Sequence, residues 1–114
     1  LDMLSYARSS PPARQSCSLN EIVNQVYELM VEKARERQID LVLDLDSTLP
    51  SVSVDVEDIH YCLMNLVTNA VEAVDGQGTV VIETEKRSVS GGILGEDVGR
   101  EGEYAVLRVA ERRA

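Results

Sequence analysis

The feature that most constrains this chain is a helix-forming segment at residues 55–74, which a glycine turn and a β-branched strand follow directly. Asp55 is a good N-cap, and Asp58 lies in the first turn, where the helix dipole favours a negative charge. An amphipathic helix has to bury its apolar face against another element, so this segment predicts a helix packed on a sheet. The apolar face comprises Val56, Ile59, Leu63, Val67, Ala70 and Val74.

The opposite face of this helix is mostly polar, and it contains Asn65 and Asn69. Residues four apart on a helix lie on one face, one turn from each other. A carboxamide oxygen is a hard ligand that suits Mg²⁺, and a carboxamide nitrogen can donate to a phosphate. The pair is therefore a candidate site for a metal-bound nucleotide, although the same spacing also occurs on helix faces that only contact water. We expect both amides to point into one shared cleft. The other members of the polar face are Asp58, Tyr61, Cys62 and Glu72.

Hydrophobic periodicity and turn residues predict the remaining elements. A helix is expected over residues 18–38, where Ser18 and Glu21 have the spacing of a capping box. Strands are expected at residues 40–46, 79–84 and 104–109. A turn at 47–50 follows the first strand, a glycine-rich hairpin loop at 87–102 precedes the last one, and residues 111–114 are a polar end. The order predicts an α/β (α+β) two-layer sandwich, with helices on one face of a mixed, mostly antiparallel sheet.

Composition narrows the function classes. The chain has 114 residues and a net charge of −9, from 20 acidic and 11 basic residues, which argues against a nucleic-acid surface. ATP stays compatible with this charge because it can arrive with Mg²⁺. Two cysteines, Cys17 and Cys62, match no metal-ligand spacing, so we expect reduced thiols and a cytoplasmic protein. No membrane-spanning run or signal peptide is visible, and a start without Met indicates a segment of a longer protein.

DVEDIHYCLMNLVTNAVEAV followed by GQGTVVIET resembles the N-box region of sensor histidine kinases, whose ATP-binding fold is shared with Hsp90 chaperones and type II topoisomerases. The resemblance implies that Asn69 coordinates Mg²⁺ and that Asn65 contacts the phosphates or the metal-bound water. It also implies that Ala70 keeps the helix close to the sheet. Glu72 stands where many relatives carry a basic residue near the phosphates. We therefore leave two interpretations of Glu72 equally open: a contact with phosphate, or a charge at the helix end that only contacts water.

The resemblance extends over nearly the whole chain and divides it into two parts. Residues 1–12 resemble the end of a dimerisation and phosphotransfer helix with its linker, with Leu1 and Leu4 on the helix face toward a partner. Residues 13–114 resemble the N-terminal part of the ATP-binding domain.

Two departures from the family pattern bear on activity. The phosphoacceptor histidine of the family lies upstream of residue 1, and His60 sits inside the N-box helix, where a packed or half-exposed side chain is expected. The family also follows its return strand with an Asp-x-Gly-x-Gly turn that binds adenine. Glu111 stands at the Asp position, and no glycine follows it before Ala114. We therefore expect a domain that is incomplete at its C-terminal edge, with no catalytic residue in this chain.

The expected function is that of a fragment of a two-component sensor histidine kinase. The parent would bind Mg²⁺ and ATP, phosphorylate a histidine on its dimerisation domain, form a homodimer and signal to a response regulator. The parent can be membrane-anchored, although this segment has no membrane contact. The fragment alone is expected to bind little ATP and to be inactive, and to associate through residues 104–109 or 1–8. Two alternatives stay open: a degenerate, non-catalytic module for dimerisation or partner binding, and another ATPase of this fold, such as an anti-sigma-factor kinase.

Overall fold

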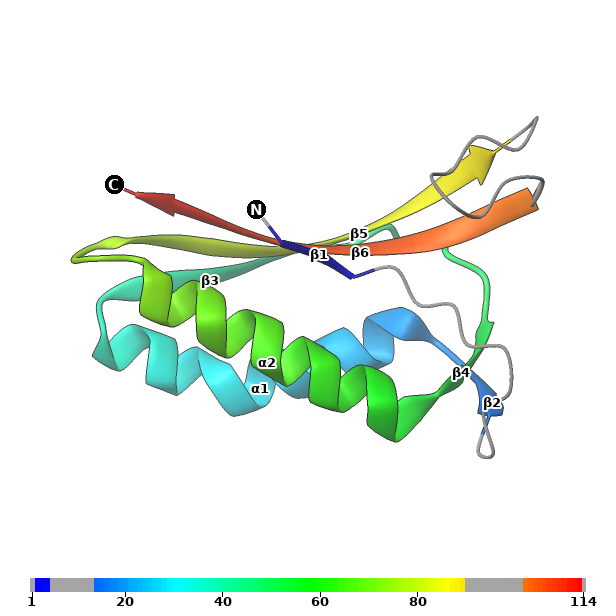
Figure 1. Cartoon of the computed structure of the whole chain (residues 1–114), viewed down its shortest axis with the longest axis horizontal. Coiled ribbons are helices and arrows are strands. Elements are labelled where there is room, and N and C mark those ends of the chain that lie inside the picture. The colour runs from blue at the N-terminus through cyan, green and yellow to red at the C-terminus, as the bar shows by residue number, and fades with distance from the viewer. Residues whose placement is uncertain (1, 5–13, 90–101, 114) are drawn as a thin grey trace.

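A computed structural model describes residues 2–4, 14–89 and 102–113 of the protein. Two helices pack on one face of a four-stranded sheet, which has the strand order β1-β6-β5-β3 (Figure 1). Strands β3 and β5 are parallel, and the other neighbours are antiparallel. This architecture confirms the predicted two-layer sandwich with a mixed, mostly antiparallel sheet. The elements of the two layers are α1 (Leu19–Glu36), α2 (Val56–Ala73), β1 (Asp2–Leu4), β3 (Ile39–Asp44), β5 (Gly78–Val89) and β6 (Gly102–Arg113).

Helix α2 forms as the sequence predicts. The Asp55 side chain accepts a hydrogen bond of 3.2 Å from the backbone N–H of Asp58, as an N-cap does. Leu63 and Val67 have no exposed surface, and they anchor the apolar face of α2 to the sheet. Of the six residues predicted for that face, only Val56 is half-buried and the others are buried. The turn after α2 uses Gly76 at a φ of 88°, a conformation that glycine adopts at no steric cost.

Helix α1 begins at Leu19 with Ser18 as its N-cap. The predicted capping box is not formed, because the Ser18 side chain makes no capping hydrogen bond. The Ser18 carbonyl instead accepts from the backbone N–H of Glu21 at 3.1 Å. Val23, Val26 and Ala34 are fully buried, so α1 has an apolar face toward the core, in keeping with the hydrophobic periodicity that predicts this helix.

The hairpin of β5 and β6 is longer than the sequence predicts. Each strand has twelve residues, and the register runs from Gly78 opposite Arg113 to Val89 opposite Gly102. The prediction that residues 111–114 form a polar end is therefore wrong for 111–113, which continue β6. Backbone hydrogen bonding to β5 holds these charged residues in a strand whatever their intrinsic preference. Most of the predicted loop at 87–102, residues 90–101, lies outside the described residues.

The N-terminal segment differs from the predicted helix. Asp2–Leu4 form β1, which pairs antiparallel with β6 and places Met3 opposite Arg108. Residues 1 and 5–8 lie outside the described residues. An isolated helix of two turns is marginal in water, whereas the open edge of β6 offers backbone partners at once.

A second, two-stranded sheet was not predicted. It joins β2 (Arg14–Cys17) and β4 (Val52–Asp55) in an antiparallel pair just before α2. Within the described residues, neither helix is both long and apolar enough to cross a membrane.

Candidate functional site

Asn65 and Asn69 lie on the exposed face of α2, one helical turn apart. The face is set by the buried residues on the other side of the helix, where Leu63, Val67 and Ala70 pack against the core. Neither asparagine side chain hydrogen bonds to another described residue. Both amide oxygens are therefore available to a ligand. The two side chains share one face, as the spacing predicts, but the described residues do not enclose them in the expected cleft.

The surroundings of the two asparagines are polar and acidic. Tyr61 is 68% exposed one turn before Asn65, and Glu72 is exposed beyond Asn69. Asp58 and Glu57 add negative charge in the first turn of α2. This charge favours a cation over a bare phosphate on the same face.

No group of three or more His, Cys, Asp or Glu side chains in the described parts of the chain could hold a metal ion. A metal on the α2 face would therefore need ligands from elsewhere. Mg²⁺ commonly binds in this way, with one or two protein oxygens, several waters and the phosphates of a substrate. The residues present match a metal that arrives with a nucleotide better than a permanent metal centre.

Glu111 lies on β6 opposite Val80 of β5. Leu107 and Val109 face the helices, so the alternation of a strand puts Glu111 on the same face of the sheet. Its Oε2 atom is shielded from solvent. Glu111 thus holds a carboxylate oxygen on the helix side of the sheet. The resemblance described above aligns Glu111 with the aspartate of the Asp-x-Gly-x-Gly turn.

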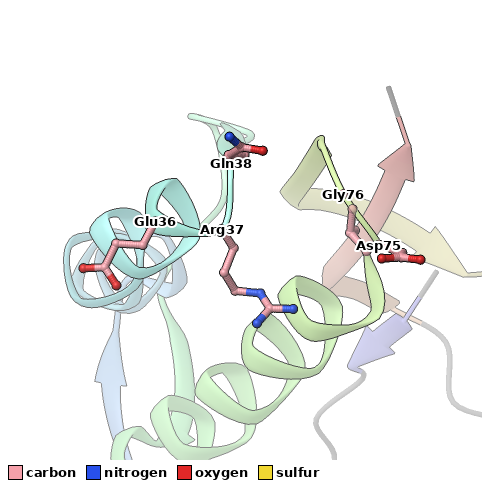
Figure 2. A pocket seen from close by; sticks show the side chains of 6 residues that line it. Glu36, Arg37, Gln38, Asp75 and Gly76 are labelled. Carbon is pink, nitrogen blue, oxygen red and sulfur yellow. The ribbon is translucent and has the colours of Figure 1, made fainter.

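A pocket of about 360 Å³ lies where α1 and α2 end (Figure 2). Its lining combines the end of α1 with the turn after α2, and Arg37 extends from α1 toward the last turn of α2 (Figure 2). Neither Asn65 nor Asn69 lines it. The pocket therefore lies apart from the predicted site. Its lining residues are Glu36, Arg37, Gln38, Val74, Asp75 and Gly76.

Sequence reasoning missed a hydrogen-bond network that fixes the start of α1 to the sheet. The Thr84 hydroxyl donates to Oδ1 of Asn20 at 2.9 Å and accepts from the backbone N–H of Asp46, also at 2.9 Å. The Asn20 side chain donates to the backbone carbonyl of Asp46 at 2.9 Å. Thr84 is 6% exposed, so its hydroxyl needs these partners. One signal of this network was present in the sequence, because the polar Thr84 stands at an inward position of a strand rich in β-branched residues.

The Asp46 carboxylate closes the turn after β3. Its Oδ1 accepts from the Thr48 hydroxyl at 2.6 Å and from the Thr48 backbone N–H at 2.9 Å, and Oδ2 accepts from the backbone N–H of Lys86 at 3.3 Å. Hydrogen bonds to Thr48, first from its hydroxyl and then from its backbone N–H, lower the pKa of Asp46 below the ordinary value of 3.8. This carboxylate is a structural group, and it lies apart from the α2 polar face.

The two cysteines are free thiols and both are half-buried. Burial, followed by the nearby charge of Glu21, raises the pKa of Cys17, which lowers the fraction of reactive thiolate at neutral pH. His60 is half-exposed on α2, which matches the expectation of a half-exposed residue.

Comparison with known proteins identifies the relatives of this chain. No family model matches the sequence. The sensor histidine kinase ZraS of Escherichia coli (strain K12) is 30% identical over 90 residues, which cover 79% of this chain and 19% of ZraS. The circadian input-output histidine kinase CikA of Synechococcus elongatus is 30% identical over 96 residues, which cover 82% of this chain and 11% of CikA. The chain thus spans less than a fifth of the length of these relatives.

Solved structures with the same fold are also histidine kinases. The catalytic domain of histidine kinase ThkA matches with a TM-score of 0.59 and 36% identity, over 63% of this chain and 49% of that domain. Full-length ShkA in complex with AMPPNP matches with a TM-score of 0.62 and 26% identity, over 75% of this chain and 18% of ShkA. A histidine kinase from Burkholderia phymatum matches with a TM-score of 0.60 and 27% identity, over 65% of this chain and 34% of that kinase. Its fold and these relatives together show that the chain belongs to the sensor histidine kinases and corresponds to part of their catalytic, ATP-binding domain.

Proposed function

We propose that this segment contributes a magnesium–ATP site to a two-component sensor histidine kinase, and that the site lies on the polar face of α2. The observation that carries the proposal is the pair Asn65 and Asn69, exposed one turn apart with no hydrogen-bond partner among the described residues. The match to ShkA, whose solved complex holds AMPPNP, supports a nucleotide ligand for a domain of this fold.

Each asparagine has a separate role in this proposal. The Asn69 side-chain oxygen would coordinate Mg²⁺, and the Asn65 amide would contact the phosphates or a metal-bound water. Glu72 and the acidic first turn of α2 favour the cation and leave little attraction for phosphate alone. When bound, Mg²⁺ supplies charge neutralisation at the transferred phosphoryl group.

Glu111 is the proposed counterpart of the adenine-binding carboxylate. It lies on the helix side of β6 with Oε2 shielded from solvent, which supports this role. Its side chain is one methylene longer than an aspartate, and strand β6 continues past it in place of a glycine turn. We therefore propose that the 114-residue chain alone binds ATP weakly and is inactive.

The parent protein would transfer the γ-phosphoryl group of ATP to a histidine on its dimerisation domain. Apart from the proposed magnesium–ATP contacts, we assign this chain no group that accepts the phosphoryl group, and we place the acceptor histidine outside it, because His60 lies within the helix of the proposed nucleotide site. We propose a homodimeric parent in the cytoplasm or anchored to a membrane, with a response regulator as its signalling partner. We also propose that residues 1–12 adjoin the dimerisation helix of the parent.

The two alternatives are less well supported. The reported relatives and solved structures are named as histidine kinases, and none of them is an anti-sigma-factor kinase or a non-catalytic module.

The test uses the parent kinase that carries these residues, incubated with magnesium and γ-labelled ATP. We expect acid-labile label on histidine, and we expect Asn69→Ala to reduce it by at least about a hundredfold, since positioning and charge neutralisation carry most of this chemistry. Glu28→Ala, an exposed substitution on α1, is the matched control and should leave labelling unchanged. Full labelling by the Asn69→Ala kinase would contradict the assignment of the site.

A further inference from the structure

The sheet has a second face, turned away from α1 and α2, and no described helix covers it (Figure 1). An apolar row crosses this face, because Val42 of β3 pairs with Val81 of β5, and Val81 pairs with Ala110 of β6. These three residues do not belong to the core cluster under the helices. Val81 and Ala110 are 8% and 7% exposed, whereas Val42 at the sheet edge is 36% exposed. We call this surface the outer face.

Charged side chains flank the apolar row, and their signs differ between the two sides of the sheet. Asp40 and Asp44 lie on β3, one on each side of Val42. Arg112 and Arg108 lie on β6, one on each side of Ala110. In the pairing register, Asp40, Thr79 and Arg112 form one row across the three strands. Asp44, Glu83 and Arg108 form another row. The outer face is thus acidic along β3 and basic along β6, with one apolar row across it and Glu83 and Glu85 on the central strand β5.

Three of these four charges have no partner within the described part of the chain. Asp40, Asp44 and Arg112 are exposed and form no ion pair there. Arg108 is the exception, since it contacts Glu83 at 3.7 Å and Glu85 at 3.5 Å. These contacts also neutralise the two glutamates in the middle of the face.

This pattern is self-complementary under a two-fold rotation. Consider a two-fold axis that runs parallel to the strands, above β5, and relates two copies stacked face to face. Each row of one copy then lies over the same row of the other copy, and β3 of one copy lies over β6 of the other. Asp40 then faces Arg112 of the partner subunit, Asp44 faces Arg108 of the partner subunit, and the exposed Val42 lies over Ala110 of the partner subunit. Sheets that pack face to face keep their strands within about 30° of each other, so the central rows stay opposed.

We propose that the outer face is the contact surface between two copies of this chain, with β3 of each copy lying over β6 of the other. The inference does not depend on the nucleotide site, which lies on the opposite side of the sheet. Three strands about 4.8 Å apart and three rows about 7 Å apart give a contact of roughly 300 Å² per copy. That is below the roughly 800 Å² per partner of a standard interface, so the dimer is weak and reversible.

The net charge of −9 makes the test sharper. Two copies repel each other overall, so any substitution that adds positive charge should strengthen association if only net charge matters. Asp40→Arg adds positive charge but removes a proposed contact. The local and the global effects therefore predict opposite outcomes.

The experiment is sedimentation equilibrium of the whole chain from about 10 μM to about 1 mM, a range chosen for a small interface. We expect a monomer–dimer equilibrium that Asp40→Arg and Arg112→Asp each weaken about tenfold or more, because each reversal faces like charges twice per dimer. The double variant Asp40→Arg/Arg112→Asp should recover the affinity to within about threefold, since it exchanges the two signs. Glu28→Arg on α1 is the matched control for Asp40→Arg and should not weaken the dimer. Unfolding midpoints verify that each variant is folded.

Three results would overturn the proposal. One is a monomer across the whole concentration range. Another is a dimer that both single reversals leave intact, which would show that another surface, such as the edge of β6, makes the contact. The last is a double variant that stays as weak as the singles.

Discussion

The Thr84 hydroxyl donates a 2.9 Å hydrogen bond to Oδ1 of Asn20, and this bond joins two residues that are 64 positions apart in the chain. Asn20 lies in the first turn of α1 and Thr84 lies in the middle of β5. The Asn20 amide also donates to the backbone carbonyl of Asp46, which follows β3. The start of α1, the turn after β3 and strand β5 are therefore fixed to one another.

We expect Thr84→Val to destabilise the fold by about 1–3 kcal/mol, because valine keeps the shape but leaves the Asn20 oxygen and the Asp46 N–H without a partner. Urea unfolding of wild type, Thr84→Val, Asn20→Ala and the double variant would measure the coupling between the two residues. Additive losses would show that the hydrogen bond contributes nothing of its own.

The asparagines of the α2 face should behave in the opposite way. Asn65→Ala and Asn69→Ala are expected to change the free energy of unfolding by less than about 0.5 kcal/mol, since both side chains are exposed and bond to no described residue. Alanine is also a better helix former than asparagine. Leu63→Ala, on the buried face of the same helix, is the control and should cost about 2–5 kcal/mol. A large loss in either asparagine variant would point to a structural role.

Isothermal calorimetry should detect no saturable heat when Mg-ATP is titrated into the 114-residue chain up to millimolar concentration. The physical reason is that Glu111 lies within a regular strand, so the backbone around it cannot form the glycine turn that the family uses for adenine. A dissociation constant in the micromolar range would contradict this expectation and would show that α2 and Glu111 suffice.

Asp46 should contribute a pH-dependent part of the stability. Hydrogen bonds to Thr48 lower the pKa of its carboxyl in the folded state, so the stabilisation is present above the unfolded value and is lost as the pH falls through the folded value. Carboxyl chemical shifts followed from neutral to acid pH should show Asp46 titrating below its ordinary value of 3.8. In Thr48→Val, which keeps the backbone N–H, the pKa should move part of the way back. An unchanged pKa in this variant would exclude the hydroxyl as the main cause.

The sequence predicted the elements whose signals are local. Asp55 and the apolar spacing that ends at Val74 defined α2 to within a residue, and the alternation around Leu41 defined β3. Asn65 and Asn69 were correctly placed on one face for the same reason. The part of the chain that the structure describes does not by itself enclose them in the expected cleft, because a cleft depends on which other segments lie nearby, and spacing on one helix does not report that.

The elements that the sequence missed depend on pairing between distant segments. Asp2–Leu4 is a strand because the edge of β6 is available to it, and its own residues suggest a helix. Arg14–Cys17 has no strand pattern and pairs with Val52–Asp55. Glu111 is in a strand because β5 continues opposite it. The polar network of Asn20 and Thr84 could not be found from spacing, since only the packed fold brings α1 and β5 together.

The hairpin of β5 and β6 also bears on how the strand pairing is set. Its register is fixed by inward side chains such as Ile82 and Val109, which would turn to the wrong face if either strand slipped by one residue. The connection between Val89 and Gly102 is therefore not needed to set the pairing. The buried layer thus sets the strand pairing independently of how many residues join the two strands, because the entropy of closing a loop grows only slowly with its length.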